Sequence, residues 1–515
     1  MTHLAHLGTT TALVTLMATP TLADVTANDV WDSFTSLYQA FGMDIDATKA
    51  QSGNRLRLSD LKLSAEFPFD LGSMTVTTTG FDLIENDDGT VDIKVPDNMP
   101  MAMALTLPND IFATATMDYR FNDYSTQISG NPGDFTILSN IGRAEMEVTS
   151  LNVTGLDVQD TDFDLKLIFT MDDINSEATI TSGALLQVSQ NITYGAMAMN
   201  GIFTGKDVNA GNVESTFVMT MDSMKSNSTL AIPATGIDLM NLPAQLREGM
   251  SFQATSEVQG QASQQQMTIN GEMATDQTTT VGSSATSMAF SKDGVTINAH
   301  SSDYFIDYVM AELPFPIQLA FSDAALRLGM PLLKSDSEQG FVYALDLDGI
   351  TMADGLWNQF DPTAGLPRNP ARMMLDLSGK GNLFVDLLDF DAMSEVIEEN
   401  IIFGELTALT LNDMDISAVG ARLTGAGAFT FDNSVRGAFE YLPTPSGEAS
   451  FRLVGLNDVL NYLVKIGLLE NDEAFGVRMG LSMVAVVVDG SKDVLISDIV
   501  ATPNGHFFAN GKRLK

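Results

Sequence analysis

The chain has 515 residues, no cysteine, four histidines and a net charge of −40. Without cysteine it lacks thiol nucleophiles, thiolate metal sites and disulfides. Its 66 acidic against 26 basic residues exclude the basic footprint that nucleic-acid binding needs. Only His300 and His506 lie outside the N-terminal segment, which leaves few groups suited to proton transfer near neutral pH.

The first 23 residues carry no Lys, Arg, Asp or Glu and contain an apolar run over residues 7–18. Pro20 ends this run, and Thr21 and Ala23 then place small side chains before Asp24. This arrangement predicts a signal peptide over residues 1–23, with histidines where a basic region is usual; a buried N-terminal helix is the alternative. We therefore expect a periplasmic or envelope-associated protein. No later apolar run reaches the roughly 18 residues that span a bilayer, so we expect no transmembrane anchor after cleavage.

The dominant pattern after the leader is alternation of apolar and polar residues with a period of two. Antiparallel strands with one solvated face produce this pattern. We therefore predict a mainly β (α+β) fold, in which a long, curved antiparallel meander forms an elongated sheet or sheets. The clearest alternating segments are residues 73–83, 145–148, 163–167, 217–221, 341–347 and 409–416.

A few segments have helical spacing instead. Residues 29–41 are predicted as a helix that Thr26 caps and Gly42 ends, and residues 457–466 as one that Asn457 caps and Gly467 ends. Further helices are predicted over residues 239–247, 389–399 and 472–483.

Residues 251–288 are rich in Gln, Ser and Thr and hold few apolar positions. Because residues 267–269 and 272–273 still alternate, we predict an exposed, polar part of the sheet there rather than disorder. The segment is also the best candidate boundary between two β-rich halves. The first half would span residues 24–250 and include the N-terminal helix. The second would span residues 251–515, with helices near 389–399 and 457–483, and one continuous sheet is the alternative.

Short acidic segments are the first place to look for metal sites. Residues 85–89 read Glu-Asn-Asp-Asp-Gly, but Ile84 and Val95 occupy the first and last ligand positions of an EF-hand loop. The Asp-Gly turn of a β-hairpin is predicted instead, and residues 346–349 and 413–415 are interpreted in the same way. No nucleotide-binding, hydrolase or metalloprotease motif occurs. With both His300 and His506 expected on surface strands, we predict no enzyme, no cofactor and no metal.

Methionine and phenylalanine are abundant, with 29 of each. Met99, Met101 and Met103 alternate along one expected strand, as Met197 and Met199 do along another, so each set shares a face. Packing in the core is the common role of such side chains. An apolar groove is the alternative, because methionine adapts to irregular ligands.

The order of motifs near the C-terminus resembles a known family. Residues 425–431 and 449–454 are expected strands, and residues 455–469 read Gly-Leu, a helix, and Gly-Leu-Leu. A second helix follows, and residues 510–514 read Asn-Gly-Lys-Arg-Leu. This order is similar to an alphaproteobacterial periplasmic family, the domain of unknown function 2125, which implies no activity, cofactor or catalytic residue. A more distant likeness in architecture, to AsmA-type envelope proteins, implies a β-sheet groove associated with lipid handling.

An apolar sheet face that few helices can cover must be buried against something else. The favoured prediction is a non-enzymatic envelope protein that binds lipid, or an envelope protein, through an apolar groove of the sheet. A structural or assembly protein with a closed sandwich core is the first alternative. An outer-membrane β-barrel is the second, although Leu514-Lys515 replaces a terminal aromatic residue and Tyr and Trp are too few for interfacial girdles.

Overall fold

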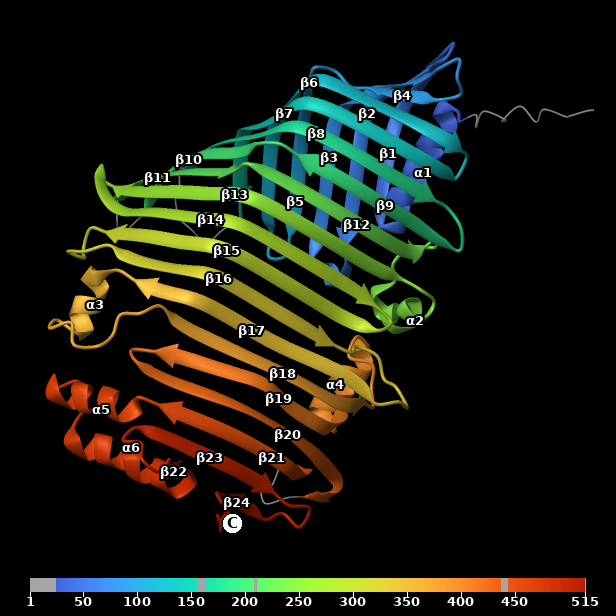
Figure 1. The fold of residues 1–515 in the computed structure, drawn as a ribbon. Helices are drawn as coiled ribbons and strands as arrows, with labels where there is room; N and C mark the ends of the chain where they lie inside the picture. The colour runs from blue at the N-terminus through green and yellow to red at the C-terminus, as the bar shows by residue number, and fades with distance from the viewer. Residues whose placement is uncertain (1–24, 156–162, 208–210, 400, 437–442, 515) are drawn as a thin grey trace, which may run out of the picture.

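The computed structural model describes residues 25–155, 163–207, 211–399, 401–436 and 443–514. Their strands form one long, curved, antiparallel sheet of 25 strands, accompanied by six short α-helices (Figure 1). This architecture confirms the predicted fold class, and the single sheet differs from the two packed sheets of a sandwich. The predicted signal peptide lies outside the described residues.

The strands of the first half differ widely in length, from four residues in β4 to 21 in β6 and β7. They are β1 (Met43–Ser52), β2 (Arg55–Phe67), β3 (Gly72–Glu85), β4 (Val91–Lys94), β5 (Asn98–Leu107), β6 (Ile111–Asn131), β7 (Asp134–Thr154), β8 (Phe163–Thr181), β9 (Leu185–Tyr194), β10 (Met197–Asp207), β11 (Gly211–Met221) and β12 (Ser223–Pro233). The remaining strands are β13 (Ser251–Ile269), β14 (Glu272–Ser291), β15 (Gly294–Met310), β16 (Ile317–Met330), β17 (Gln339–Met352), β18 (Ala371–Leu383), β19 (Gly404–Ala418), β20 (Ala421–Arg436), β21 (Pro443–Val454), β22 (Val486–Val487), β23 (Val494–Ala501), β24 (Phe507–Ala509) and β25 (Lys512–Arg513).

One helix precedes the first strand, and the others connect strands. The α-helices are α1 (Ala27–Ala40), α2 (Leu242–Arg247), α3 (Asp354–Phe360), α4 (Phe390–Glu399), α5 (Leu456–Lys465) and α6 (Asn471–Val484). Two short 3-10 helices, η1 (Pro68–Asp70) and η2 (Leu239–Asn241), complete the set.

The sheet is a meander in which neighbours in the chain are mostly neighbours in space. Strands β13 to β21 pair in chain order, and β21 then pairs with β23. In the first half, two short strands lie end to end where one long strand would otherwise fit. Both β4 and β5 pair with β3 and β6, both β9 and β10 pair with β8, and both β11 and β12 pair with β13.

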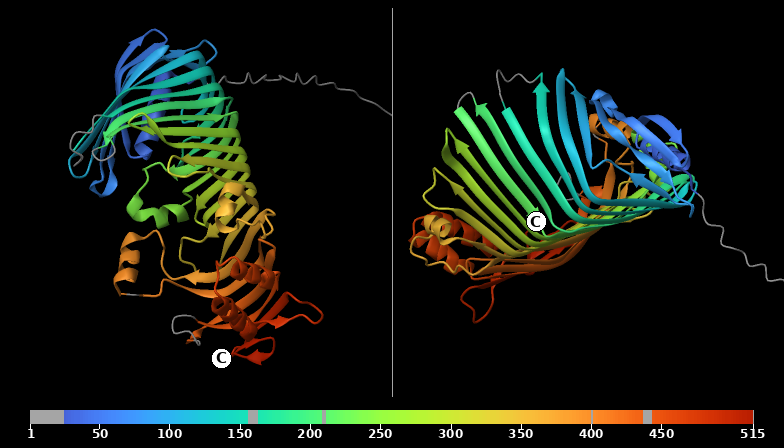
Figure 2. Two further views of the ribbon diagram at one scale, coloured as in Figure 1. Left: turned by 90° about the vertical axis from the view of Figure 1, so that its left-hand side faces the viewer. Right: turned by 90° about the horizontal axis from the view of Figure 1, so that it is seen from above.

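Residues with left-handed backbone angles cross the long strands along one line, which we call the crease. Asp60, Asp123, Asp173 and Asp303 have φ of 55°, 54°, 50° and 53° within β2, β6, β8 and β15. Gly142 of β7 lies between Asp123 and Asp173, because the pairing on both sides of it is continuous. The same line continues through Gly195, Asp222, Gly260, Gly282, Ser322 and Gly349, of which Gly260 and Gly349 have left-handed backbone angles. The long strands bend part-way along their length (Figure 2), and short polar residues and glycine tolerate the left-handed conformation that this requires.

The crease also shifts the alternation of side chains by one residue. In a regular strand, residues i and i+3 point to opposite faces. Across the crease, however, the rings of Phe121 and Tyr124 are in contact, with centroids 5.6 Å apart. Leu58 is likewise buried in the core cluster against which Leu61 packs. One face of the sheet therefore stays apolar on both sides of the bend.

That face is concave, and α1 and α2 cover its N-terminal end. Thr26 caps α1 as predicted, because its hydroxyl accepts from the Asp29 N–H while the Asp29 carboxylate accepts from the Thr26 N–H. Val30 and Trp31 of α1 pack on buried side chains of β2, β3, β4, β6 and β7. A second cluster joins Leu246 of α2 to β8, β9 and β12. Burial of each large apolar side chain contributes roughly 1.5–3 kcal/mol, so these clusters fix the N-terminal half.

The concave face has less cover beyond β16. Neither buried cluster of the described residues includes a side chain of β17 to β23. Tyr343 of β17 and Met373 of β18 point to this face and are 37% and 41% exposed. Figure 2 shows the sheet as a trough, with α2 and α4 on its concave side.

The structure confirms some of the predicted turns and strands and corrects others. Residues 86–90 form a turn between β3 and β4, as predicted. The turns predicted at residues 346–349 and 413–415 are wrong, because these residues lie inside β17 and β19. Gly349 has φ of 68° at the crease, so an Asp-Gly pair bends the strand there without ending it. Residues 251–288 form β13 and most of β14, paired along their length, which confirms sheet rather than disorder. The predicted exposure is only partly correct, because most of these side chains are half-buried.

The predicted helices are confirmed near their expected bounds, and α3 was not predicted. The predicted cap of α5 is wrong, because Gly455 rather than Asn457 is its N-cap. The carboxylate of Asp493 instead accepts hydrogen bonds from the backbone N–H groups of Asn457 and Asp458. This cap comes from a residue distant in sequence, which local pattern cannot reveal.

Candidate functional site

A continuous row of apolar side chains crosses the concave face from strand to strand. Residues that are Cα partners in neighbouring strands point to the same face. Pairing joins, in order, Phe135, Ile180, Val188, Leu230, Phe252, Phe290, Val295 and Met330, from β7 to β16. The first part of this row is covered by α2, and Met330 at its end is exposed.

A second row runs beside the first and extends it toward the C-terminus. It joins Met288, Ile297, Leu328, Tyr343, Leu377 and Leu411, from β14 to β19. Its side chains are half-buried or exposed, although each is apolar or aromatic. We call the two rows together the concave apolar face.

A cavity opens on the concave apolar face beside the segment between β18 and β19. Its volume is about 490 Å³, which lies in the usual range for sites that hold small molecules. Its lining is mainly apolar or aromatic and also includes Gln339, Asn382 and Glu405. The apolar and aromatic side chains are Leu328, Met330, Pro331, Phe341, Val342, Tyr343, Leu383, Leu387, Phe403 and Leu406. An apolar ligand, rather than a charged one, suits such a lining.

The five methionines singled out from sequence lie on the same face. In neighbouring strands, the Cα partner of Met99 is Tyr119, that of Met101 is Met117 and that of Met199 is Met219. Met197 has Met171 and Met221 as its partners on either side. Met103 pairs with Val76, which pairs with Leu63, on the core side of β2. Met197 is buried and the other four are half-buried. The structure thus brings the predicted methionines together and adds Met117, Met146, Met171, Met219 and Met221 to them.

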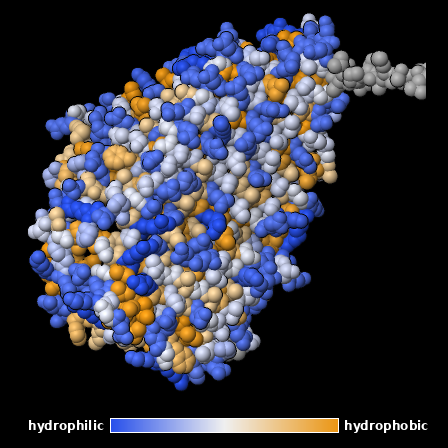
Figure 3. Space-filling view, viewed as in Figure 1, coloured by the Kyte–Doolittle hydropathy of each residue, from blue (hydrophilic) through white to orange (hydrophobic). Residues whose placement is uncertain are grey.

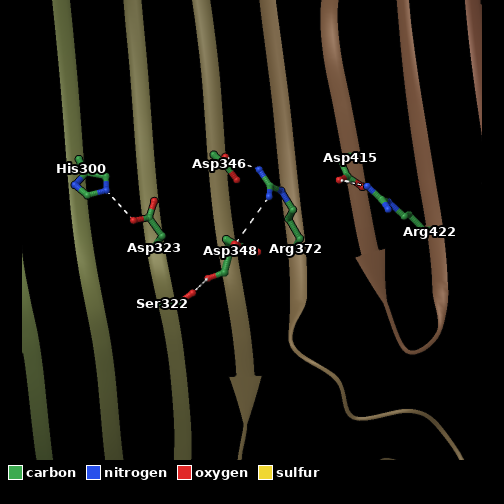
Figure 4. Close-up of polar contacts among 8 residues, drawn as sticks. All are labelled: His300, Ser322, Asp323, Asp346, Asp348, Arg372, Asp415 and Arg422. Carbon is green, nitrogen blue, oxygen red and sulfur yellow. Dashed lines mark hydrogen bonds and ion pairs between the residues drawn. The ribbon is translucent and has the colours of Figure 1, made fainter.

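The convex face carries a ladder of ion pairs across β15 to β20 (Figure 4). His300 Nε2 lies 2.7 Å from Asp323, Arg372 lies 2.8 Å from Asp346, and Arg422 lies 2.8 Å from Asp415. Hydrogen bonds from Arg422 hold the pKa of Asp415 below its ordinary value.

The ladder marks a solvated face rather than a binding site. A shallow hollow of about 600 Å³ lies over β13 to β18, with alanines at 285, 325 and 344 between the charged side chains. Arg327, which lines it, already pairs with Asp376 at 3.1 Å. Exposed ion pairs contribute roughly 0–1 kcal/mol each. Figure 3 shows this face as largely hydrophilic, with hydrophobic residues gathered in the lower part of the view.

Sequence reasoning found part of this arrangement and missed the rest. His300 lies on a surface strand, as predicted, but its partner Asp323 was not foreseen. The rows of the concave face were also missed, because they depend on pairing between distant segments. One local signal was present: an apolar residue, two short polar residues and a second apolar residue recur at the crease, as in residues 58–61, 121–124 and 171–174.

A single curved sheet with an apolar concave face and a charged convex face defines a mainly β protein. A family model described as an uncharacterized protein conserved in bacteria (DUF2125) matches residues 227–496, from β12 to β23, and the chain belongs to this family. The family resemblance of the C-terminal motifs is thereby confirmed. No curated protein and no solved structure matches the chain. Among the described residues, the helices are too short or too polar to cross a membrane, and no cluster of three potential metal ligands occurs.

Proposed function

We propose that this protein is a non-enzymatic lipid-binding protein of the bacterial envelope, which holds acyl chains against the concave apolar face. The observation that carries the proposal is the pair of apolar rows joined strand to strand from β7 to β19. Their C-terminal part lies open beside a cavity of about 490 Å³. Contiguous apolar surface of this kind is unusual on a protein that binds nothing.

The energy of acyl-chain burial is sufficient for binding. Each methylene group moved from water to an apolar site contributes about 0.8 kcal/mol, so a chain of about 14 methylenes contributes about 11 kcal/mol before the cost of ordering. Most of the lining side chains are apolar, and the polar groups among them are those of Gln339, Tyr343, Asn382 and Glu405. Such a site selects for apolar length rather than for a particular headgroup.

Methionine lining supports an irregular, flexible ligand. Met288 and Met330 flank the open part of the face and are 38% and 39% exposed. Their unbranched side chains adjust to different chain shapes with little strain. The predicted leader supports export to the periplasm, where such a protein would meet envelope lipids.

The test is detergent-free purification of the exported protein, native mass spectrometry, and extraction of whatever is bound. We expect a lipid adduct on the wild-type chain. The Met288→Gln/Met330→Gln variant should lose most of it, because two amide groups would enter the acyl site without partners.

A matched control removes two methionines elsewhere. Met479 and Met483 of α6 are also exposed but lie outside the cavity. The Met479→Gln/Met483→Gln variant should keep the adduct. A wild-type protein with a clean apo mass, and no uptake of added fatty acid, would overturn the proposal.

A further inference from the structure

The segment between β18 and β19, residues 384–403, exposes a dense apolar patch beside the cavity. Ile397 is 76% exposed and Ile402 is 63% exposed. Phe384, Phe390, Ile401 and Phe403 are also exposed. We call these six side chains the α4 patch. Water contacts all of them, although such side chains favour burial.

The base of this segment is fixed to the rest of the protein. Arg247 of the α2 helix contacts Asp386 through two hydrogen bonds of 3.1 and 2.5 Å, and Asp386 also accepts from the Lys334 N–H. Val396 of α4 is buried. Ile397 lies about 100° further around the helix axis than Val396, so the burial of Val396 leaves Ile397 facing outward.

The α4 patch is continuous with the proposed lipid site. Phe403 belongs to the patch and also lines the cavity, together with Leu383 and Leu387. On the other side, the ring of Phe390 contacts Phe69 of η1, with centroids 6.0 Å apart. The patch thus spans from the β2–β3 connection to the mouth of the cavity.

Charge restricts what can cover the patch. Residues 384–403 contain six carboxylates and no Lys or Arg. An anionic membrane surface would repel this segment, whereas a bilayer of net-neutral lipids would not. The segment also lacks the Tyr, Trp and Arg that dominate protein–protein hot spots. Aliphatic and Phe side chains instead suit insertion at the boundary between headgroups and acyl chains.

We propose that the α4 patch docks on the surface of a net-neutral lipid bilayer, so that an acyl chain passes Phe403 directly into the cavity. This inference rests on the proposed function and adds to it the route of entry. Ile397 and Ile402 lead the insertion because they are the most exposed members of the patch.

Flotation with vesicles tests the docking. Wild-type protein should float with phosphatidylcholine–phosphatidylethanolamine vesicles and bind them better than vesicles that contain phosphatidylglycerol. The Ile397→Ser/Ile402→Ser variant should bind at least about tenfold more weakly, since both side chains lose apolar area. The Phe475→Ser/Met479→Ser variant removes similarly exposed side chains from α6 and should bind as the wild type does.

A second measurement separates docking from cargo binding. Uptake of a monomeric fluorescent fatty acid, measured without vesicles, should be unchanged in Ile397→Ser/Ile402→Ser. Failure of the wild type to take up the fatty acid would defeat the proposed function, whereas failure to float would defeat the docking alone. Equal flotation of the Ile variant and the wild type, or stronger binding to the anionic vesicles, would overturn the docking proposal.

Discussion

Gly80 of β3 pairs with Ser59 beside the crease residue Asp60, and its substitution gives a specific prediction. Gly80 has φ of 93°, and a Cβ added there would lie 2.0 Å from the Leu58 carbonyl oxygen and 2.8 Å from the carbonyl carbon. The carbonyl belongs to backbone paired in the sheet, so β2 would have to move. Left-handed strain contributes about 1–3 kcal/mol and overpacking about 1–3 kcal/mol. We therefore expect Gly80→Ala to destabilise the N-terminal half by about 3–5 kcal/mol.

Gly53 provides the matched control for this substitution. It has φ of 59° in the turn between β1 and β2, and nothing lies within 4 Å of an added Cβ. Gly53→Ala should therefore cost only about 1 kcal/mol. Urea unfolding compares the free energies of unfolding of the two variants. Because a long sheet need not unfold in a single two-state step, hydrogen exchange at the amides of β2 and β3 also measures the local effect. If both variants are equally stable, close packing at the crease does not hold this part of the sheet.

Three further outcomes follow from buried contacts. Burial alone would raise the pKa of Asp361, but hydrogen bonds from Tyr462 and two backbone N–H groups hold it below its ordinary value. The ionised Asp361 carboxylate stabilises the folded protein fully above its unfolded pKa of about 4, and this stabilisation is lost as pH falls through the lower folded pKa. The wild type should therefore melt at a lower temperature in acid than at neutral pH, and Asp361→Asn should make this difference in melting temperature smaller. Arg247→Ala leaves the Asp386 carboxylate without its ion pair. The free energy of local opening of α4, measured by hydrogen exchange, should fall by about 2 kcal/mol, which is less than for a fully buried pair because the guanidinium is partly exposed. Phe135→Ala empties a buried site and should lower stability by about 3–5 kcal/mol in urea, and a loss below 1 kcal/mol would contradict the assigned core.

The sequence predicted the strands and helices better than it predicted how they pair and pack. Alternation identified the strands, and Thr26 marked the start of α1 because its cap is local. Residues 346–349 were misread because Asp-Gly serves equally well in a hairpin turn and at the crease. The difference depends on the neighbouring strand, which supplies Ser322 opposite Gly349.

The candidate site was predictable only in part for the same reason. Alternation showed that Met99 and Met101 share a face, but not that Met117 and Met146 join them. The rows depend on which residues of neighbouring strands are partners. The periodicity of one sequence shows which residues share a face of a strand but does not show this register. The exposure of Ile397 was equally hidden, because α4 has apolar residues on more than one side.

The backbone angles at the crease also determine how far apart the two sides of the trough lie. Along this line, Asp123, Gly142 and Asp173 hold neighbouring strands at the same bend. The crease therefore divides the sheet into two parts. Small changes of φ and ψ at the aligned crease residues would add up to one movement that opens or closes the angle between these parts. Substitution of lining side chains would change which ligands fit, whereas the span between the two parts would stay under the control of the backbone.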